Sequence, residues 1–208
     1  MKLGVLSDIH ADIERLHDVL DRFEHVHHVD AVLAAGDLVG RGENPDETLS
    51  MIRQRGVIAV RGNHERMFEE DARISAENRD FIKSLSFDWR GAIGGFRLFL
   101  THGKPGSHGA QGNPRWGIWR DHVSNTYLDM MLCELEVDIL ITGHTHKTLF
   151  QRVPHGCVVN PGSLCRFYAP RESSETYGVL TLPDMTFEVF GITDAQMNGA
   201  STSSHPRP

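Results

Sequence analysis

A recurring pairing of a short apolar run with a polar cluster directly after it places the strongest constraint on the fold of this chain. The first three runs span residues 3–6, 31–35 and 57–60, and each is followed within three residues by Asp or Asn. Apolar residues recur at helical spacing over 13–23, and a second helix is expected over 46–54, directly after a proline. Alternation of helices with continuously apolar strands is typical of a parallel sheet covered by helices. The first half of the chain therefore predicts an α/β fold.

The second half of the chain changes towards β structure. Residues 89–92 and 96–101 flank a pair of glycines, which predicts a hairpin, and a helix over 128–135 is followed by a strand over 139–142. Further strands are expected at 149–153, 157–159, 177–182 and 186–190. Residues 103–117 form a long Gly/Pro/Asn-rich stretch of the kind that often serves as a functional loop. We expect one domain over residues 1–193 and a disordered polar tail over 194–208.

The net charge and the cysteine pattern exclude several classes of protein. The chain has 28 Asp and Glu against 21 Lys and Arg, a formal charge of −7, so a stable nucleic-acid complex is not expected. No stretch approaches the roughly 20 apolar residues of a membrane span. Three cysteines without CxxC spacing form neither a disulfide framework nor a thiolate zinc site. We expect a cytoplasmic protein without membrane association, and the sequence leaves its oligomeric state open.

Five polar clusters share one placement, at the end of an apolar strand. Because the carboxyl ends of strands converge on one crevice in an open α/β sheet, these clusters are expected to meet. Their carboxylate, imidazole and amide groups, without thiolate, suit Mn²⁺, Fe, Zn²⁺ or Ni²⁺. The candidate metal ligands are Asp8, His10, Asp37, Asn63, His102, His144 and His146. Seven donors exceed what one ion needs, so the sequence predicts two ions that share the Asp37 carboxylate.

The order and composition of these clusters resemble the motifs of a known family. They are Asp8-x-His10, Gly36-Asp37, Gly62-Asn63-His64-Glu65, His102-Gly103 and Gly143-His144-Thr145-His146. In this order they look like the calcineurin-like metallophosphoesterase superfamily. The likeness covers residues 1–163 and includes Asn160-Pro161-Gly162-Ser163, which resembles the small bacterial phosphoesterases of that group. The resemblance implies a two-sheet β sandwich flanked by helices, a four-layer αββα arrangement.

The resemblance also implies how the ligands divide between two divalent metal ions. One ion would be held by Asp8, His10, Asp37 and His146. The other would be held by Asp37, Asn63, His102 and His144. A hydroxide between the ions would be the nucleophile, because divalent cations lower the pKa of bound water towards 7. We expect Mn²⁺ as the metal, with Fe, Zn²⁺ or Ni²⁺ as alternatives.

Two residues beside these ligands receive roles from the resemblance. His64 is expected to face the substrate and to donate a proton to the leaving alkoxide or to stabilise the phosphorane. Residues 36–42 and 61–65 resemble motifs of the serine/threonine phosphoprotein phosphatase branch, by which Arg41 would contact phosphate oxygens together with Asn63 and His64. The alternatives are a structural histidine for His64 and a solvated loop charge for Arg41. Gly40 departs from that branch, which has an aspartate there that supports the catalytic histidine.

These features predict a metal-dependent phosphoric ester hydrolase in which a metal-bound hydroxide attacks phosphorus. Phosphodiester or nucleotide-type substrates are preferred over phosphoproteins because Gly40 replaces the supporting acid and the chain is compact. One alternative is a phosphomonoesterase that acts on phosphoserine or phosphothreonine. Another is a non-catalytic metal-binding scaffold, as in the retromer subunit that resembles these enzymes. The expected partner is a small-molecule or nucleotide phosphoester.

Residues outside the clusters receive mostly structural interpretations. His25, His27 and His28 follow an amphipathic helix and are expected to lie at its solvated end. Trp116 and Trp119 have two interpretations, stacking on a ring of the substrate or packing of the long loop onto the body. The three cysteines are interpreted as core residues.

Overall fold

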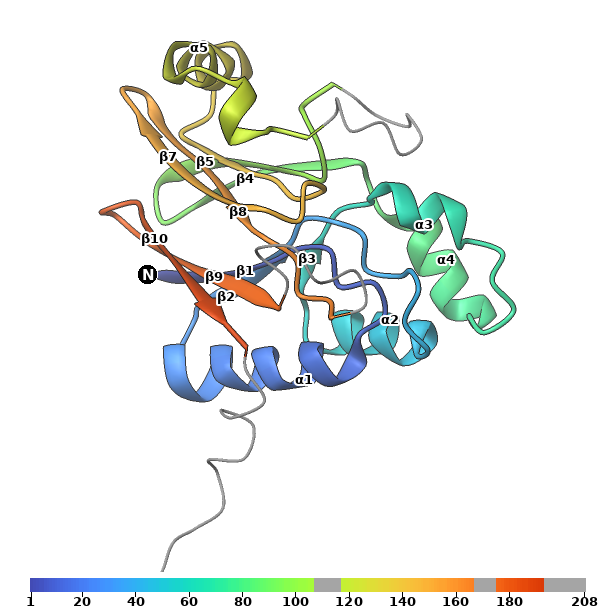
Figure 1. The fold of residues 1–208 in the computed structure, drawn as a ribbon. Coiled ribbons are helices and arrows are strands. Elements are labelled where there is room, and N and C mark those ends of the chain that lie inside the picture. Colours follow the sequence, from blue (N-terminus) through green and yellow to red (C-terminus); the bar gives the residue numbers. More distant parts are fainter. Residues whose placement is uncertain (107–116, 167–174, 193–208) are drawn as a thin grey trace, which may run out of the picture.

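The protein is described here by a computed structural model over residues 1–106, 117–166 and 175–192. Two five-stranded mixed sheets lie face to face (Figure 1). The first sheet has the strand order β10-β9-β1-β2-β3. Its strands are β1 (Lys2–Leu6), β2 (Ala31–Ala34), β3 (Ile58–Ala59), β9 (Thr176–Thr181) and β10 (Thr186–Gly191). The strands β1, β2 and β3 are parallel, whereas β9 and β10 are added antiparallel at one edge.

The second sheet has the strand order β4-β5-β6-β8-β7. Its strands are β4 (Asp88–Ile93), β5 (Phe96–Thr101), β6 (Ile139–Ile141), β7 (Thr148–Val153) and β8 (Gly156–Pro161). A parallel centre of β5, β6 and β8 is bounded by the antiparallel edge strands β4 and β7. The predicted hairpin is confirmed, since β4 and β5 pair in register around Gly94 and Gly95.

Helices cover the outer faces of both sheets. Helices α1, α2 and α4 contribute Leu16, Leu49 and Ile82 to one core against the first sheet, and α5 contributes Leu132 to another against the second. The helices and helical turns are α1 (Ile13–Arg22), η1 (Phe23–His27), α2 (Pro45–Gln54), α3 (Asn63–Met67), α4 (Ala76–Ser84), η3 (Arg120–His122) and α5 (Asn125–Leu135). The predicted four-layer αββα arrangement is confirmed (Figure 1).

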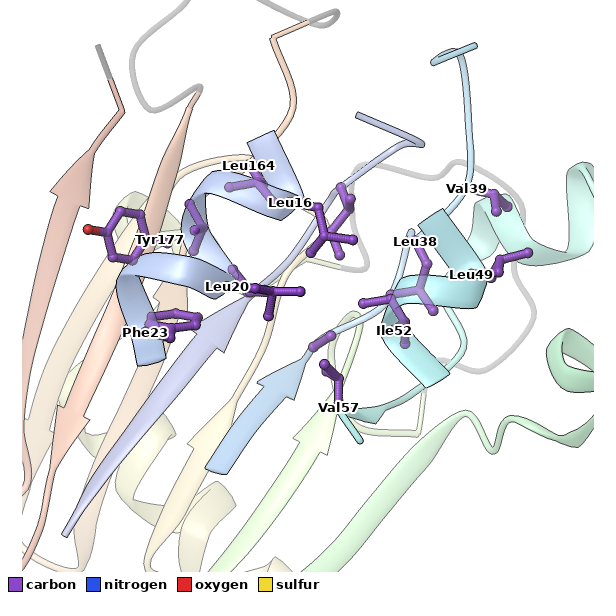
Figure 2. Packing of buried hydrophobic residues seen from close by; sticks show 14 of the residues in the cluster. Leu16, Leu20, Phe23, Leu38, Val39, Leu49, Ile52, Val57, Leu164 and Tyr177 are labelled. Carbon is purple, nitrogen blue, oxygen red and sulfur yellow. The ribbon is translucent and has the colours of Figure 1, made fainter. Parts of the chain in front are cut away.

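Alternating burial along β1 explains how one strand serves two cores. Leu3 and Val5 belong to the core between the sheets, whereas Leu6 packs on the helix side with Leu16 and Phe23. This is the period-two alternation of a strand covered on both faces. Figure 2 shows the helix side, where α1 and α2 lay their apolar faces on the sheet. Each fully buried Leu stabilises the fold by about 1.5–3 kcal/mol relative to exposure.

Three predictions about individual segments were wrong in part. The third strand was expected over 57–60, but only Ile58–Ala59 pairs with β2. His27 is half-buried, not solvated: its Nε2 atom lies 3.0 Å from the hydroxyl of Tyr177 because η1 turns the ring back onto β9. Cys133 is exposed on α5, whereas the other two cysteines are buried.

Several expectations fall on parts of the chain that are not described. The predicted tail over 194–208, Trp116 and residues 107–116 of the long loop lie outside the described residues. In the part of the chain that is described, none of the helices has the length and apolar character required to cross a bilayer.

Candidate active site

The seven predicted metal ligands lie at strand ends of both sheets. In the first sheet, two follow β1, one follows β2 and one follows β3 as the first residue of α3. In the second sheet, one follows β5 and two follow β6. In chain order they are Asp8, His10, Asp37, Asn63, His102, His144 and His146. Backbone hydrogen bonds join these ends, for example from Asp8 N to Gly36 O at 3.1 Å and from Gly143 N to His102 O at 2.9 Å.

The backbone of these loops is strained at the donor residues. Five donors have positive φ angles: Asp8 at 54°, His10 at 50°, Asp37 at 52°, His144 at 69° and His146 at 55°. Non-glycine residues rarely adopt this conformation, and each instance costs of order 1–3 kcal/mol. Such strain concentrates at binding and catalytic sites. Of the ten described non-glycine residues with positive φ, six lie in these loops, which supports the site independently of the motif.

One group of donor atoms converges around Asn63. The Asn63 Oδ1 atom lies 3.2 Å from His102 Nε2 and 3.0 Å from His144 Nδ1. The two imidazole nitrogens are 3.2 Å apart, and His102 Nε2 is 3.2 Å from Asp37 Oδ2. His102 Nδ1 donates to the carbonyl oxygen of Ala35 at 2.7 Å. That bond leaves Nε2 as the ring nitrogen that faces the group.

A second group lies on the other side of Asp37. His146 Nε2 is 3.1 Å from Asp8 Oδ1 and 3.2 Å from His10 Nε2. His10 Nε2 is also 3.9 Å from Asp8 Oδ1 and 4.0 Å from Asp37 Oδ2. Asp37 Oδ2 therefore faces both groups, whereas Asp37 Oδ1 accepts a hydrogen bond from His64 N at 2.8 Å.

These distances fit metal binding. Donor atoms about 2.1 Å from one ion lie about 3–4 Å from each other, and the distances within both groups fall in this range. In addition, Asp8 Oδ1 is fully buried and faces two ring nitrogens, His146 Nε2 at 3.1 Å and His10 Nε2 at 3.9 Å. A buried carboxylate charge is costly in a protein interior unless it is paired, and a cation pairs it. The residues therefore fit two divalent ions that share Asp37.

The charges of the cluster support the same interpretation. Burial disfavours the charge of Asp8, but the imidazoles of His146 and His102 hold the pKa of Asp8 well below its usual range. Burial also opposes ionisation of Asp37, yet His102 lowers the pKa of Asp37 to about 2. Burial lowers the pKa of His10 to about 4. At neutral pH the site therefore offers two carboxylates and a neutral His10, the protonation states of metal ligands.

Glu65 has a positioning role that sequence reasoning missed. Its buried carboxylate accepts hydrogen bonds from four backbone N–H groups, those of Asp37, Leu38, Val39 and Gly62, at 2.6–3.0 Å. Burial, together with the charge of Asp37, raises the pKa of Glu65 to about 7. Glu65 thus joins the loop after β2 to the loop after β3. Its place in the Gly62–Glu65 motif could have marked Glu65 as a site residue, but the motif does not show which backbone groups Glu65 contacts.

Asn160 has a related role in the second sheet. Its side-chain amide donates to Gly143 O at 2.8 Å and to Thr145 Oγ1 at 3.2 Å, and its Oδ1 accepts from Gly162 N. These bonds hold the loop that carries His144 and His146. Asn160 therefore supports the metal pocket through the position of this loop.

His64 and Arg41 are placed differently. His64 is half-buried beside the cluster: its Nε2 atom is 3.9 Å from Asp37 Oδ2, and its ring centroid is 4.5 Å from that of His10. Burial lowers the pKa of His64, and the nearby carboxylates of Asp37 and Asp8 oppose this shift. Arg41 is exposed on the loop after β2, outside the buried cluster. The contact of Arg41 with substrate therefore stays a prediction.

The fold and the site define a metallophosphoesterase, and comparison with known proteins names the family. The model of the calcineurin-like phosphoesterase superfamily domain matches residues 1–185. The chain belongs to this superfamily, whose members use divalent metal ions to hydrolyse phosphoesters.

Relatives of the chain agree with this assignment. A protein of Methanocaldococcus jannaschii named phosphodiesterase is 26% identical over 178 residues, which cover 80% of this chain and 86% of that protein. A second, uncharacterized protein of the same organism is 26% identical over 69% of this chain, but the match spans only 62% of its length, less than two thirds. The crystal structure of a hypothetical protein from Pyrococcus horikoshii has the same fold, with a TM-score of 0.74, 18% identity and coverage of 94% and 90% of the two chains.

Proposed function

We propose that the protein is a dinuclear metal-dependent phosphodiesterase whose seven strand-end donors hold two divalent ions. Asp8, His10, Asp37 and His146 would hold one ion. Asp37, Asn63, His102 and His144 would hold the other. The observation that carries the proposal is the spacing of about 3 Å between donor atoms brought together from strands of both sheets.

The ions, when bound, would supply a nucleophile at neutral pH and neutralise charge on the phosphoryl oxygens. We propose Mn²⁺ as the metal, since carboxylate, amide and imidazole donors suit it, with Fe, Zn²⁺ and Ni²⁺ as competitors. His64 stands next to the donors and would protonate the leaving oxygen. Asn63, His64 and Arg41 would orient the phosphate, Arg41 from the rim of the site.

Two observations favour diesters over phosphoproteins. The relative from M. jannaschii is named a phosphodiesterase. In addition, a Cβ atom at Gly40 would lie 2.6 Å from His10 Nδ1, so position 40 has no room for the acid that supports the catalytic histidine in the phosphoprotein phosphatase branch. Without that acid, we expect better hydrolysis of substrates whose leaving group needs less proton donation from His64.

The test compares two aryl esters that share one leaving group. Protein stripped with EDTA is assayed on bis(p-nitrophenyl) phosphate and p-nitrophenyl phosphate, with Mn²⁺, Fe²⁺, Zn²⁺ or Ni²⁺ added. We expect Mn²⁺ to restore hydrolysis and kcat/KM to favour the diester. A preference for the monoester would instead support a phosphomonoesterase, and no hydrolysis with any of the four metals would support a scaffold.

The number of metal ions per chain is measured on a variant that lacks a second candidate metal site on the surface. Asp129, Cys133 and His155 each place one ligand atom within 4.8 Å of the others on the surface formed by α5 and the β7–β8 turn. Cys133→Ser removes the strongest of these ligands without touching the active site, so extra metal held there does not add to the count. We expect two ions per chain in this variant, and one ion or none would contradict the dinuclear site.

A further inference from the structure

A large hollow lies between the segment after β5 and the start of α5. Its volume is about 920 Å³, within the range of small-molecule sites. Its walls are largely aromatic and aliphatic, and one cation stands at its rim. The residues that matter for recognition are Lys104, Ile118, Trp119, Val123 and Tyr127.

The hollow is directly connected to loops that carry proposed metal ligands. Lys104 follows His102 by two residues. On the other side, the backbone of Gly117 packs closely against Thr145, which lies between His144 and His146. A Cβ atom at position 117 would lie 2.3 Å from the Thr145 methyl group. The segment that carries Trp119 therefore rests on the metal loop itself. The hollow therefore adjoins two of the loops that carry the donors.

Trp119 occupies the wall between this hollow and a smaller one of about 260 Å³. The smaller hollow is lined by Thr145 and Lys147, and Lys147 Nζ lies 5.8 Å from the centroid of the Trp119 ring. In the larger hollow, Lys104 Nζ lies 5.2 Å from the centroid of the Tyr127 ring. Cations held over aromatic faces can neutralise an anionic substrate close to a stacking surface.

This combination indicates the chemical class of the occupant. Half-buried Trp119 and exposed Tyr127 offer ring faces, and Ile118 and Val123 add apolar wall. A planar aromatic base gains about 1–3 kcal/mol by stacking on such a ring. A ribose or phosphate beside the base would find Lys104. The phosphoserine group itself carries no aromatic ring that could stack in the hollow.

We propose that the larger hollow binds the base of a nucleoside phosphodiester, with Trp119 and Tyr127 as stacking surfaces and Lys104 beside the sugar-phosphate. The proposal rests on the proposed function, since it places the phosphorus of the same substrate at the metal site. It also assigns Trp119 to substrate stacking, one of the two interpretations left open by the sequence.

The test uses two diesters that differ only in the base-bearing group. Thymidine 5′-(p-nitrophenyl) phosphate carries a nucleoside, whereas methyl p-nitrophenyl phosphate carries none, and both release the same nitrophenolate. The readout is the ratio of their kcat/KM values with Mn²⁺. We expect Trp119→Ala to lower this ratio about 10-fold, because the loss falls on the nucleoside ester. Trp119→Phe should restore most of the ratio.

Two further variants separate stacking from general damage. Tyr127 lines the larger hollow but not the smaller one behind Trp119, so Tyr127→Ala should also lower the ratio. An unchanged ratio would overturn the assignment to the larger hollow. Phe150→Ala, which removes an exposed aromatic ring on β7, should leave the ratio as in the wild type. Equal losses on both esters in Trp119→Ala would show that Trp119 only supports the metal loop and would overturn the proposal.

Failure of the inference differs from failure of the proposed function. If the wild type hydrolyses the methyl ester but shows no advantage for the nucleoside ester, the hollow has another role and the phosphodiesterase stands. If the wild type hydrolyses neither ester, binding of thymidine 5′-monophosphate measured by calorimetry tests the role of the hollow. Binding that Trp119→Ala weakens supports the hollow, and binding that is absent or unaffected overturns it.

Discussion

Asp37 is the residue on which both metal groups depend. Its Oδ2 atom lies 3.2 Å from His102 Nε2 and 4.0 Å from His10 Nε2, so one oxygen faces both. Asp37→Asn keeps the shape but removes the charge. Loss of a contact outside the ligand shell already costs 10–100-fold in affinity or activity. We therefore expect Asp37→Asn to lower kcat/KM on bis(p-nitrophenyl) phosphate by about 100-fold or more.

The metal content of Asp37→Asn should fall together with its activity. Asp46→Asn is a matched control, since Asp46 is a half-buried acid that bonds Ser75 and Asn78 between α2 and α4, remote from the donors. A variant at position 37 that keeps two ions and normal turnover would refute the shared ligand.

The contribution of His64 to kcat should depend on the leaving group of the substrate. It stands 3.9 Å from Asp37 Oδ2 and is half-buried, and general acid catalysis typically contributes 10²–10⁴-fold. Nitrophenolate leaves without a proton, but an alkoxide needs one. We expect His64→Ala to lower kcat about 100-fold for alkyl leaving groups and less than about 10-fold for nitrophenolate. A series of diesters with graded leaving-group pKa measures this dependence of kcat. His17→Ala, at an exposed position of α1, is the control. Equal losses across the series would indicate phosphate binding instead.

His102 couples metal binding to pH. Burial disfavours its charge, but Asp37, Asp8 and the hydrogen bond to Ala35 O raise the pKa of His102 to about 10. The metal-free protein at pH 7 therefore holds a proton on His102, and this nitrogen must lose its proton to solvent before it can bind a metal. His10, with a pKa of about 4, is already neutral.

Binding of Mn²⁺ at pH 7 is therefore expected to release at least about one proton, mainly from His102. The sign follows from competition: affinity falls as pH falls, about tenfold per pH unit for each proton released. Titration calorimetry in buffers of different ionisation enthalpy counts the protons. Binding heats that do not depend on the buffer would contradict the raised pKa.

At the scale of elements, the site depends on how the loops after β2 and β3 are joined. Glu65, at the third position of α3, accepts from Gly62 N and from the N–H groups of Asp37, Leu38 and Val39. Glu65→Gln replaces one acceptor oxygen with an NH₂ group that faces N–H donors. Each buried donor left without a partner costs about 1–3 kcal/mol.

We expect Glu65→Gln to lower the free energy of unfolding by about 1–3 kcal/mol and metal affinity by about 10–100-fold. Urea unfolding and metal titration measure these two effects. Glu77→Gln is the control, because exposed Glu77 on α4 pairs only with Arg53 among the described residues. Unchanged metal affinity in Glu65→Gln would show that the two loops hold their positions without it.

The local elements and the donors of the site were predictable because their signals are local. Apolar runs that end at Asp8 and Asp37 predict strands and their polar ends, and both residues lie there. The partners of Glu65 and His27 were not predictable. Glu65 bonds backbone atoms 26–28 residues away, and His27 meets Tyr177 150 residues away. Residue spacing carries no information about such distant contacts.

At the scale of the whole molecule, the sheet order had to come from the structure. Strand β9 pairs antiparallel with β1 although the two strands lie near opposite ends of the sequence, with Lys2 opposite Thr181. Strand β10 pairs with β9 at the edge of the sheet. The alternation of the first half predicted only a parallel sheet. Tyr177 and Phe187 of these last strands complete the cores on both faces of the first sheet, so the C-terminal strands belong to the catalytic fold.

We propose that residues 1–193 fold and act as one domain. The last described contacts support this boundary, since Ile192 is buried and its N–H donates to Glu175 O at 2.7 Å. Deletion of residues 194–208 should therefore change the free energy of unfolding by less than about 0.5 kcal/mol and leave kcat/KM unchanged. A drop in either quantity would place part of the tail within the catalytic unit.

A longer deletion, of residues 186–208, is the matched comparison. It removes β10 and with it Phe187, which is 7% exposed in the core between the sheets. Loss of a buried Phe costs about 3–5 kcal/mol, and the free edge of β9 gains unpaired backbone groups. We expect the longer deletion to unfold at much lower urea concentration, or to aggregate. Equal stability of the two truncated proteins would show that β10 is dispensable and would move the domain boundary back to β9.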